Sequence, residues 1–200
     1  MVELREILLR DKPPAFLETS PSATVPALRL PDGVIDESLD IMIWALKRSD
    51  PEGLLDMPDD GWDLIAINDG PFKQALDHTK YAVRHPDIDP VAERAKAAAV
   101  LMELGARLKA QQWLFGPRPT LADYAILPFV RQFANTDREW FDTQDWPTLR
   151  NWLQHFVEGD LFASIMRKHH PWSEGDAPIW FGHAYGPEGP AASLASRGSV

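Results

Sequence analysis

The chain has 200 residues, 44% of them hydrophobic, and a formal net charge of −10 at pH 7. This length allows one compact unit or two small domains with a sizeable core, and the negative charge argues against nucleic acid or an anionic membrane surface as a partner. The sequence contains no cysteine, which excludes disulfides, thiolate metal sites and a cysteine nucleophile within these residues. It also has no run of about 18 apolar residues and no signal-peptide pattern, so we expect a cytoplasmic protein without a membrane span.

The first elements are short. Mixed apolar and charged residues over Val2–Leu9 predict a strand, and Pro13-Pro14 ends it. Ala15–Glu18 predicts a short helix. A hairpin follows, because Ala27–Leu30 and Val34–Asp36 are two short apolar-leaning runs.

Asp32-Gly33 between these two runs predicts a tight primed turn, since both residues tolerate a positive φ. After the second run the apolar period changes. Leu39, Met42, Ile43 and Leu46 recur at helical spacing, which predicts a helix that starts near Ser38. The segment therefore forms a strand–turn–strand–helix unit.

Two dipeptides in this unit are candidates for binding a ligand. Glu37-Ser38 stands at the predicted helix start, where free backbone N–H groups and the helix dipole favour an anion and the Ser38 hydroxyl adds a donor. Val25-Pro26 opens the first strand, and a cis bond there would turn the backbone of Val25 toward a ligand, like an unpaired strand edge. The same residues also fit a capped helix and an edge strand that begins with proline.

Together these residues resemble the glutathione-binding half of the glutathione S-transferase family, whose pattern is Val-Pro before a hairpin and Glu/Asp-Ser at a helix start. The resemblance implies that the Val25 backbone binds the cysteinyl part of glutathione, that Ser38 binds the γ-glutamyl carboxylate and that Glu37 binds its ammonium group. Lys12 is a further candidate, because omega-like members place a lysine near the tripeptide. The nearest likeness is to bacterial omega-like transferases, over roughly residues 1–172.

The region after the turn-rich linker 49–53 is expected to be helical throughout. One predicted helix carries Ile65, Phe72 and Val83 on one face and is interrupted at Gly70-Pro71. The other expected helices lie within 91–114, 120–135 with a bend at Pro128, 147–156 with Pro147 in its first turn, and 161–168. The helix within 91–114 should bury a stripe of Val91, Ala98, Leu101 and Leu108.

Thr120 and Asp123 have the spacing of a capping box at the start of one of these helices. The Thr120 hydroxyl would accept from the N–H of Asp123, and the Asp123 carboxylate would reach back to the N–H of Thr120. Transferases of the resembled family also carry Ser/Thr-x-x-Asp at this place. We expect these two residues to serve folding rather than catalysis.

The remaining candidates are weaker signals. The six histidines show no metal-ligand spacing, so we expect no metal. Tyr81, Trp113 and Tyr124 could line an apolar co-substrate pocket, and they fit equally well as core aromatics. From Ser173 onward the chain is rich in Gly, Pro, Ala and Ser, which predicts a mobile tail.

The sequence departs from the resembled family at its start. A transferase of this kind begins with a strand and a helix that carry the catalytic Cys, Ser or Tyr, and the strand Val2–Leu9 resembles the second strand of that domain. No residue of this sequence is therefore a candidate for that catalytic role, and we expect a misassigned start, a truncation or a degenerate gene product.

The expected architecture is an incomplete α/β thioredoxin-like domain (residues 1–50), an all-α helical bundle (51–172) and a tail (173–200). The resemblance implies glutathione as co-substrate, an electrophile or a mixed disulfide as second substrate, and a homodimer. Glutathione would be bound by Lys12, Val25, Pro26, Glu37 and Ser38. The alternative is a catalytically silent module that binds glutathione or another protein.

Overall fold

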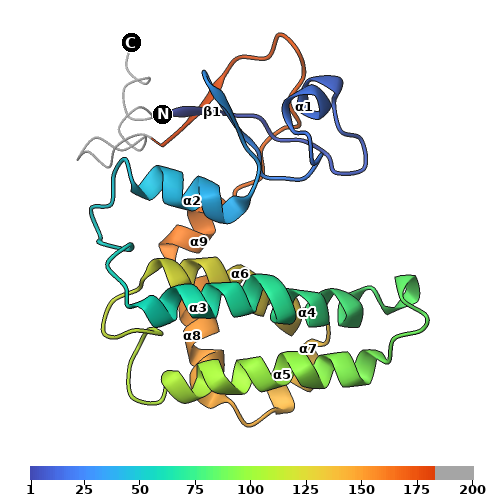
Figure 1. Ribbon diagram of the computed structural model, residues 1–200. Helices are drawn as coiled ribbons and strands as arrows, with labels where there is room; N and C mark the ends of the chain where they lie inside the picture. Colours follow the sequence, from blue (N-terminus) through green and yellow to red (C-terminus); the bar gives the residue numbers. More distant parts are fainter. Residues whose placement is uncertain (183–200) are drawn as a thin grey trace, which may run out of the picture. The chain divides into compact units, whose positions relative to one another are not determined.

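The structure is a computed structural model that describes residues 1–182, and it divides the chain into two compact units (Figure 1). Among the described residues, one unit contains residues 1–23 and 168–182. The other unit runs from Thr24 to Arg167 and holds the hairpin and most of the helices.

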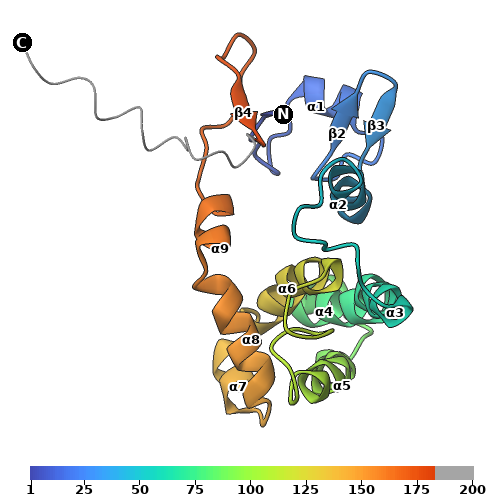
Figure 2. The same cartoon turned by 90° about the vertical axis from the view of Figure 1, so that its left-hand side faces the viewer.

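The first unit contains β1 (Val2–Leu4), α1 (Pro14–Thr19) and β4 (Ile179–Phe181), and its two strands pair antiparallel (Figure 2). The helix predicted at 15–18 is confirmed. The predicted strand exists but ends at Leu4 rather than Leu9, and a bridge between Leu8 and Asp11 closes a turn beyond it.

β4 was not predicted from the sequence, since a three-residue strand whose side chains are all exposed has no apolar alternation to reveal it. It lies within the segment that was expected to be a mobile tail from Ser173. Residues 173–182 of that segment therefore contain a paired strand, and the rest of the expected tail, 183–200, lies outside the described residues. The domain limits at residues 50 and 172 stay predictions.

The second unit opens with the predicted hairpin, β2 (Leu28–Leu30) and β3 (Gly33–Ile35). Leu30 pairs with Gly33, so the loop consists of Pro31 and Asp32. The prediction of a primed turn with positive φ was wrong: among residues 1–182 the positive φ values fall elsewhere in the chain. Pro31 explains this, because its ring fixes φ near −65° at the first loop position, where both primed turns need a positive value.

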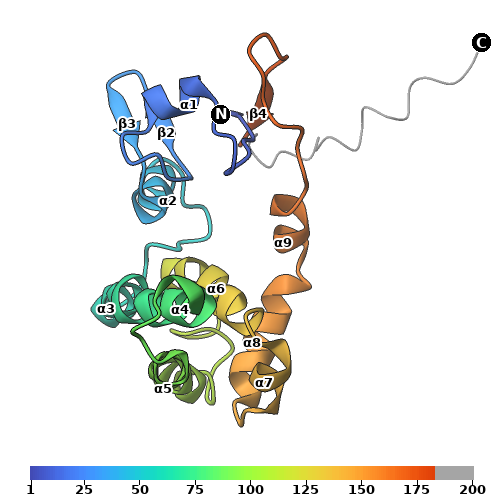
Figure 3. The same cartoon turned by 90° about the vertical axis from the view of Figure 1, so that its right-hand side faces the viewer.

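Helix α2 (Ser38–Leu46) begins at the predicted residue. Its apolar stripe, Leu39, Met42, Ile43 and Leu46, packs against the helical core, as the spacing predicted. The hairpin lies next to α2 in Figures 2 and 3. The stripe therefore fixes the start of α2 relative to the helical body of the same unit.

The predicted linker after α2 is an ordered connection. The two carboxylate oxygens of Asp50 accept hydrogen bonds from the N–H groups of Leu54 and Leu55, at 2.7 and 2.9 Å. The Arg118 guanidinium donates to the carbonyls of Glu52 and Gly53 at 2.9 and 3.0 Å. These bonds hold the connection against the loop that precedes α6.

The helical body follows the linker. It consists of α3 (Asp59–Ile67), η1 (Asn68–Phe72), α4 (Lys73–Lys80), η2 (Ala82–Arg84), α5 (Pro90–Arg107), α6 (Leu121–Ala134), α7 (Arg138–Thr143), α8 (Pro147–Val157) and α9 (Asp160–Ile165). The expected interruption at Gly70-Pro71 is the short π-helix η1. Its wider turn accommodates Pro71, which has no backbone N–H to donate. Pro147 opens α8 as predicted, whereas α7 was not predicted and α9 ends at Ile165 rather than Lys168.

The buried apolar side chains of the described residues gather in this helical body, from Leu64 to Phe156. Two residues expected on buried faces are exposed. Val83 is 94% exposed because α4 ends at Lys80, so Val83 no longer follows the helical stripe. Val91 is 62% exposed because it lies in the first turn of α5, beyond the buried positions Ala97, Leu101 and Leu104.

The capping box is confirmed at the start of α6, and its carboxylate does more than cap. Asp123 is fully buried. Its Oδ2 accepts hydrogen bonds from the backbone N–H and the hydroxyl of Thr120, at 2.9 and 3.0 Å. Its Oδ1 accepts from the N–H of Leu114 at 2.9 Å and from the indole N–H of Trp152 at 3.1 Å. Burial raises the pKa of Asp123, and these four hydrogen bonds oppose the rise.

The cap should matter for stability. We expect Thr120→Ala to lower the free energy of unfolding by about 1–2 kcal/mol, because Thr120 is buried and its hydroxyl bonds to a buried carboxylate. Asp89→Ala is the matched control, since Asp89 caps α5 on the surface, and it should cost the lower part of that range. Denaturant titration measures both, and equal stability of Thr120→Ala and the parent would contradict the capping role.

The same carboxylate should give stability a pH dependence of definite sign. Because the pKa of Asp123 is higher in the folded chain than its ordinary value of 3.8, the folded state retains the proton more readily. The contribution of this group is therefore largest below its ordinary pKa and is lost as the pH rises through the folded pKa. We expect the stability of the parent relative to Asp123→Asn to fall as the pH is raised through this window. A relative stability that rises with pH in denaturant titrations would show the opposite shift.

Candidate functional site

The candidate residues of the second unit lie at the open end of the hairpin. In the antiparallel register Leu28 stands opposite Ile35. Val25-Pro26 precedes this pair on one strand, and Glu37-Ser38 follows it on the other. Both dipeptides therefore leave the hairpin at the same end, where α2 begins (Figure 3).

The start of α2 offers unused donors. Glu37 is the N-cap residue with extended backbone (φ −102°, ψ 131°), and its carbonyl accepts the N–H of Ile41 at 3.0 Å. The side chains of Glu37 and Ser38 are exposed, and within residues 1–182 neither makes a hydrogen bond. The N–H groups of a first helical turn have no partner within their helix and carry its positive dipole end. This end of the hairpin can therefore receive a carboxylate.

The Val25-Pro26 peptide bond is cis, as expected, and Val25 is 43% exposed. Lys12 belongs to the first unit, where its Nζ donates to the carbonyl of Ala23 at 2.8 Å. The structure thus brings four of the five expected residues, Val25, Pro26, Glu37 and Ser38, to one end of the hairpin.

Two of the three aromatic candidates are neighbours. The rings of Trp113 and Tyr124 are 6.3 Å apart, and the ring of Phe156 is 6.3 Å from that of Tyr124. Tyr81 makes no ring contact with this group among the described residues; Lys80 and Arg84 stand over its ring instead, at 4.9 and 4.5 Å. Trp113 is 8% exposed, so most of it serves as core.

Tyr124 is the polar member of this aromatic group. Burial raises the pKa of its phenol, and the negative charges of Glu52 and Asp123 raise it further. The phenol therefore keeps its proton at neutral pH. It can donate a hydrogen bond, but it cannot supply an anion.

A second polar cluster joins α4 and α5. Glu93 accepts from Lys96 at 2.5 Å and bonds to the imidazole of His78 at 3.0 Å. The hydrogen bond from Lys96, and then that from His78, lower the pKa of Glu93. Among residues 1–182 no group of three or more His, Asp or Glu side chains is arranged to hold a metal ion.

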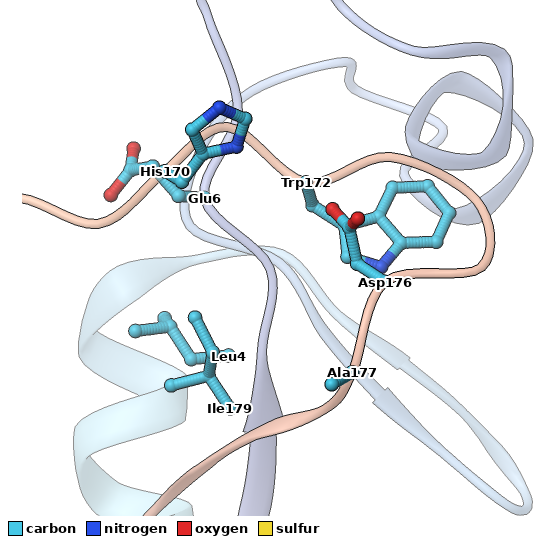
Figure 4. A pocket seen from close by; sticks show the side chains of 7 residues that line it. All are labelled: Leu4, Glu6, His170, Trp172, Asp176, Ala177 and Ile179. Atoms are coloured by element: carbon cyan, nitrogen blue, oxygen red, sulfur yellow. The ribbon is translucent and has the colours of Figure 1, made fainter.

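A cavity of about 270 Å³ lies in the first unit (Figure 4). Its lining residues are Leu4, Glu6, His170, Trp172, Asp176, Ala177 and Ile179. A wider hollow of about 720 Å³ in the same unit shares Trp172 and Asp176 with it. None of the expected site residues lines either of them, so neither marks the predicted site.

Sequence reasoning missed the two distant partners of Asp123. Leu114 lies nine residues before it and Trp152 twenty-nine after it, and neither distance corresponds to a local motif. Only a folded helical body brings the Trp152 indole to the carboxylate.

None of the helices within residues 1–182 has the length and apolar character needed to cross a membrane.

Family models match both halves of the chain. The model of the glutathione S-transferase N-terminal domain matches residues 1–53, and that of the C-terminal domain matches residues 74–155. A search of curated protein sequences found no match.

Solved structures agree on the fold. A glutathione S-transferase from Actinobacillus pleuropneumoniae has a TM-score of 0.63 and 18% identity over 76% of this chain and 72% of its own. A glutathione transferase family member from Pseudomonas fluorescens with two glutathione bound has a TM-score of 0.61 and 22% identity over 76% and 74%. One from Burkholderia graminis, with two glutathione molecules bound per subunit, has a TM-score of 0.61 and 23% identity over 76% and 70%.

These likenesses confirm the expected fold class, a small α/β N-terminal part followed by a helical domain. The two family models together match more than half of the sequence. The chain therefore belongs to the glutathione S-transferase family.

Proposed function

We propose that this chain binds glutathione at the open end of the hairpin. The single observation that carries the proposal is the β2–β3 register, which leaves Val25-Pro26 and Glu37-Ser38 at the same end of the hairpin, beside the start of α2. Family membership supports it, and so do the glutathione molecules bound to the Pseudomonas and Burkholderia relatives.

Each part of the site suits a different part of the tripeptide. The α-carboxylate of the γ-glutamyl group is an anion, and the first-turn N–H groups and hydroxyl of Ser38 are donors at a positive dipole end. The carboxylate of Glu37 suits the ammonium group that stands beside that anion. The exposed backbone of Val25 can pair with the cysteinyl N–H and C=O as a strand edge would. Lys12 is the further cation proposed near the peptide.

Of the two chemistries of this family, conjugation needs no thiol on the protein. In that reaction the thiol of glutathione gives up its proton and its sulfur forms a new C–S bond to an electrophilic carbon. Either a leaving group departs with the electron pair of its bond to that carbon, or the π electron pair of a double bond shifts to the neighbouring atom, which takes up a proton. These 200 residues contain no cysteine, so a thiol transfer that runs through a cysteine cannot use a residue of this chain. We propose an electrophile or a mixed disulfide as the second substrate, with Trp113 and Tyr124 as candidates for its apolar surroundings.

Three finer assignments rest on the sequence and remain proposals: an omega-like class, a homodimer and a cytoplasmic location. Sedimentation equilibrium of the purified chain tests the second of these. Imaging of a tagged chain in the producing cell tests the third.

Ser38 should contribute to affinity and not to stability. We expect Ser38→Ala to weaken glutathione binding by about 1–2 kcal/mol, roughly 5- to 30-fold, through loss of a hydrogen bond to a charged group. The control is Ser49→Ala, an exposed serine just beyond α2, which should bind like the parent. Isothermal titration calorimetry measures both, and equal affinities with an unchanged unfolding midpoint would reject the site.

Glu37 should bind the ammonium group of the ligand. Glu37→Gln should weaken the binding of glutathione, while an analogue that lacks the α-ammonium group should bind parent and variant alike. The reason is that only the charged pair is lost in the variant. If both ligands lose affinity equally, Glu37 acts on the helix start and not on the ammonium group.

A further inference from the structure

Backbone bonds join the two segments of the first unit. β4 lies antiparallel to β1, and the N–H of Trp172 donates to the carbonyl of Glu6 at 2.7 Å. The guanidinium carbon of Arg5 stands 4.4 Å from the centre of the Trp172 ring. Residues 168–182, called the strap below, therefore run along the N-terminal segment.

Little apolar surface holds the strap in place. The three side chains of β4, Ile179, Trp180 and Phe181, are 39%, 54% and 51% exposed. The sheet has two strands of three residues each, and an isolated pair of that size is marginally stable in water. The strap can therefore open at low cost while the helical core of the other unit stays folded.

The strap also forms most of the cavity in this unit. Five of its seven lining residues belong to the strap, namely His170, Trp172, Asp176, Ala177 and Ile179. Figure 4 shows Leu4 of β1 and Ile179 of the strap side by side at one end of this cavity. Closing the strap thus creates the cavity, and opening it removes the cavity and the strand pairing together.

An opened strap leaves β1 with unpaired N–H and C=O groups, and such an edge accepts another strand. The segment whose register fits β1 is β4, and a second copy of the chain carries the same segment. Exchange of an identical element between copies requires no new interface. We propose that residues 168–182 are a reversible strap that closes the edge of β1 within one chain, and that an opened β1 accepts β4 of a second copy.

Because the sequence contains no cysteine, introduced cysteine pairs can directly test whether β1 and β4 pair within one chain. Leu4 and Ile179 stand opposite each other, at a spacing that a disulfide can bridge. We expect the full-length Leu4→Cys/Ile179→Cys variant to form an intrachain disulfide under mild oxidation at low micromolar concentration. The control is Val2→Cys/Ile179→Cys, which is two residues out of register and should crosslink at least about tenfold more slowly.

Non-reducing electrophoresis and peptide mass mapping separate the outcomes. Equal rates for the two double variants, or no disulfide in either, would overturn the pairing. If a disulfide-linked dimer predominates at low concentration, β4 pairs with β1 of another copy even without an excess of protein, and closure within one chain is wrong. Helical circular dichroism of each variant should match that of the parent, because the substitutions lie outside the helical unit.

Strand exchange has its own test. A mixture of the single variants Leu4→Cys and Ile179→Cys should form a mixed disulfide dimer that joins residues 4 and 179, in an amount that rises with protein concentration. Adding Trp180→Pro to the second variant should reduce this product severalfold, because proline in the middle of a three-residue strand is incompatible with regular pairing. The matched control adds Ala177→Pro instead, outside the strand. Absence of the 4–179 link at every concentration would overturn the exchange.

Discussion

The helical unit depends on one buried carboxylate. Asp123 is fully buried, and its two oxygens collect four donors from three places in the chain: Leu114, Thr120 and Trp152. A buried charge without such partners costs several kcal/mol, and these four hydrogen bonds offset part of that cost. The carboxylate thereby joins the start of α6 to the loop before it and to α8. A polar network of this kind fixes one arrangement of helices, whereas apolar packing alone would accept several.

Helix α2 connects this helical body to the candidate site. The stripe of α2 packs against the same helical core, and Asp50 and Arg118 hold the connection that follows it. The hairpin itself contributes no fully buried side chain. The open end of the hairpin is therefore positioned by the helical body rather than by a core of its own, which leaves Glu37 and Ser38 exposed for a ligand.

The predictions that succeeded rest on short-range chemistry. The start of α2 at Ser38 followed from a change of apolar period, and the capping box from the three-residue spacing of Thr120 and Asp123. The interruption at Pro71 followed from its missing donor. The failures also have local causes: Asp32-Gly33 favours a primed turn, but the ring of Pro31 fixes φ near −65° at the first loop position and prevents that turn. Val83 was placed on a buried face because the helix was assumed to continue past Lys80.

The sequence by itself determined which residues form the hairpin, where α2 begins and which carboxylate caps α6, because each depends on neighbours within a few positions. The tertiary structure alone decided that Trp152 reaches Asp123, that Trp113 meets Tyr124 without Tyr81, and that β4 pairs with β1. These contacts join residues 11 to about 180 positions apart, and no local pattern encodes them. Burial of the helical core brings Trp152 to Asp123 and Trp113 to Tyr124, whereas β4 joins β1 through backbone pairing.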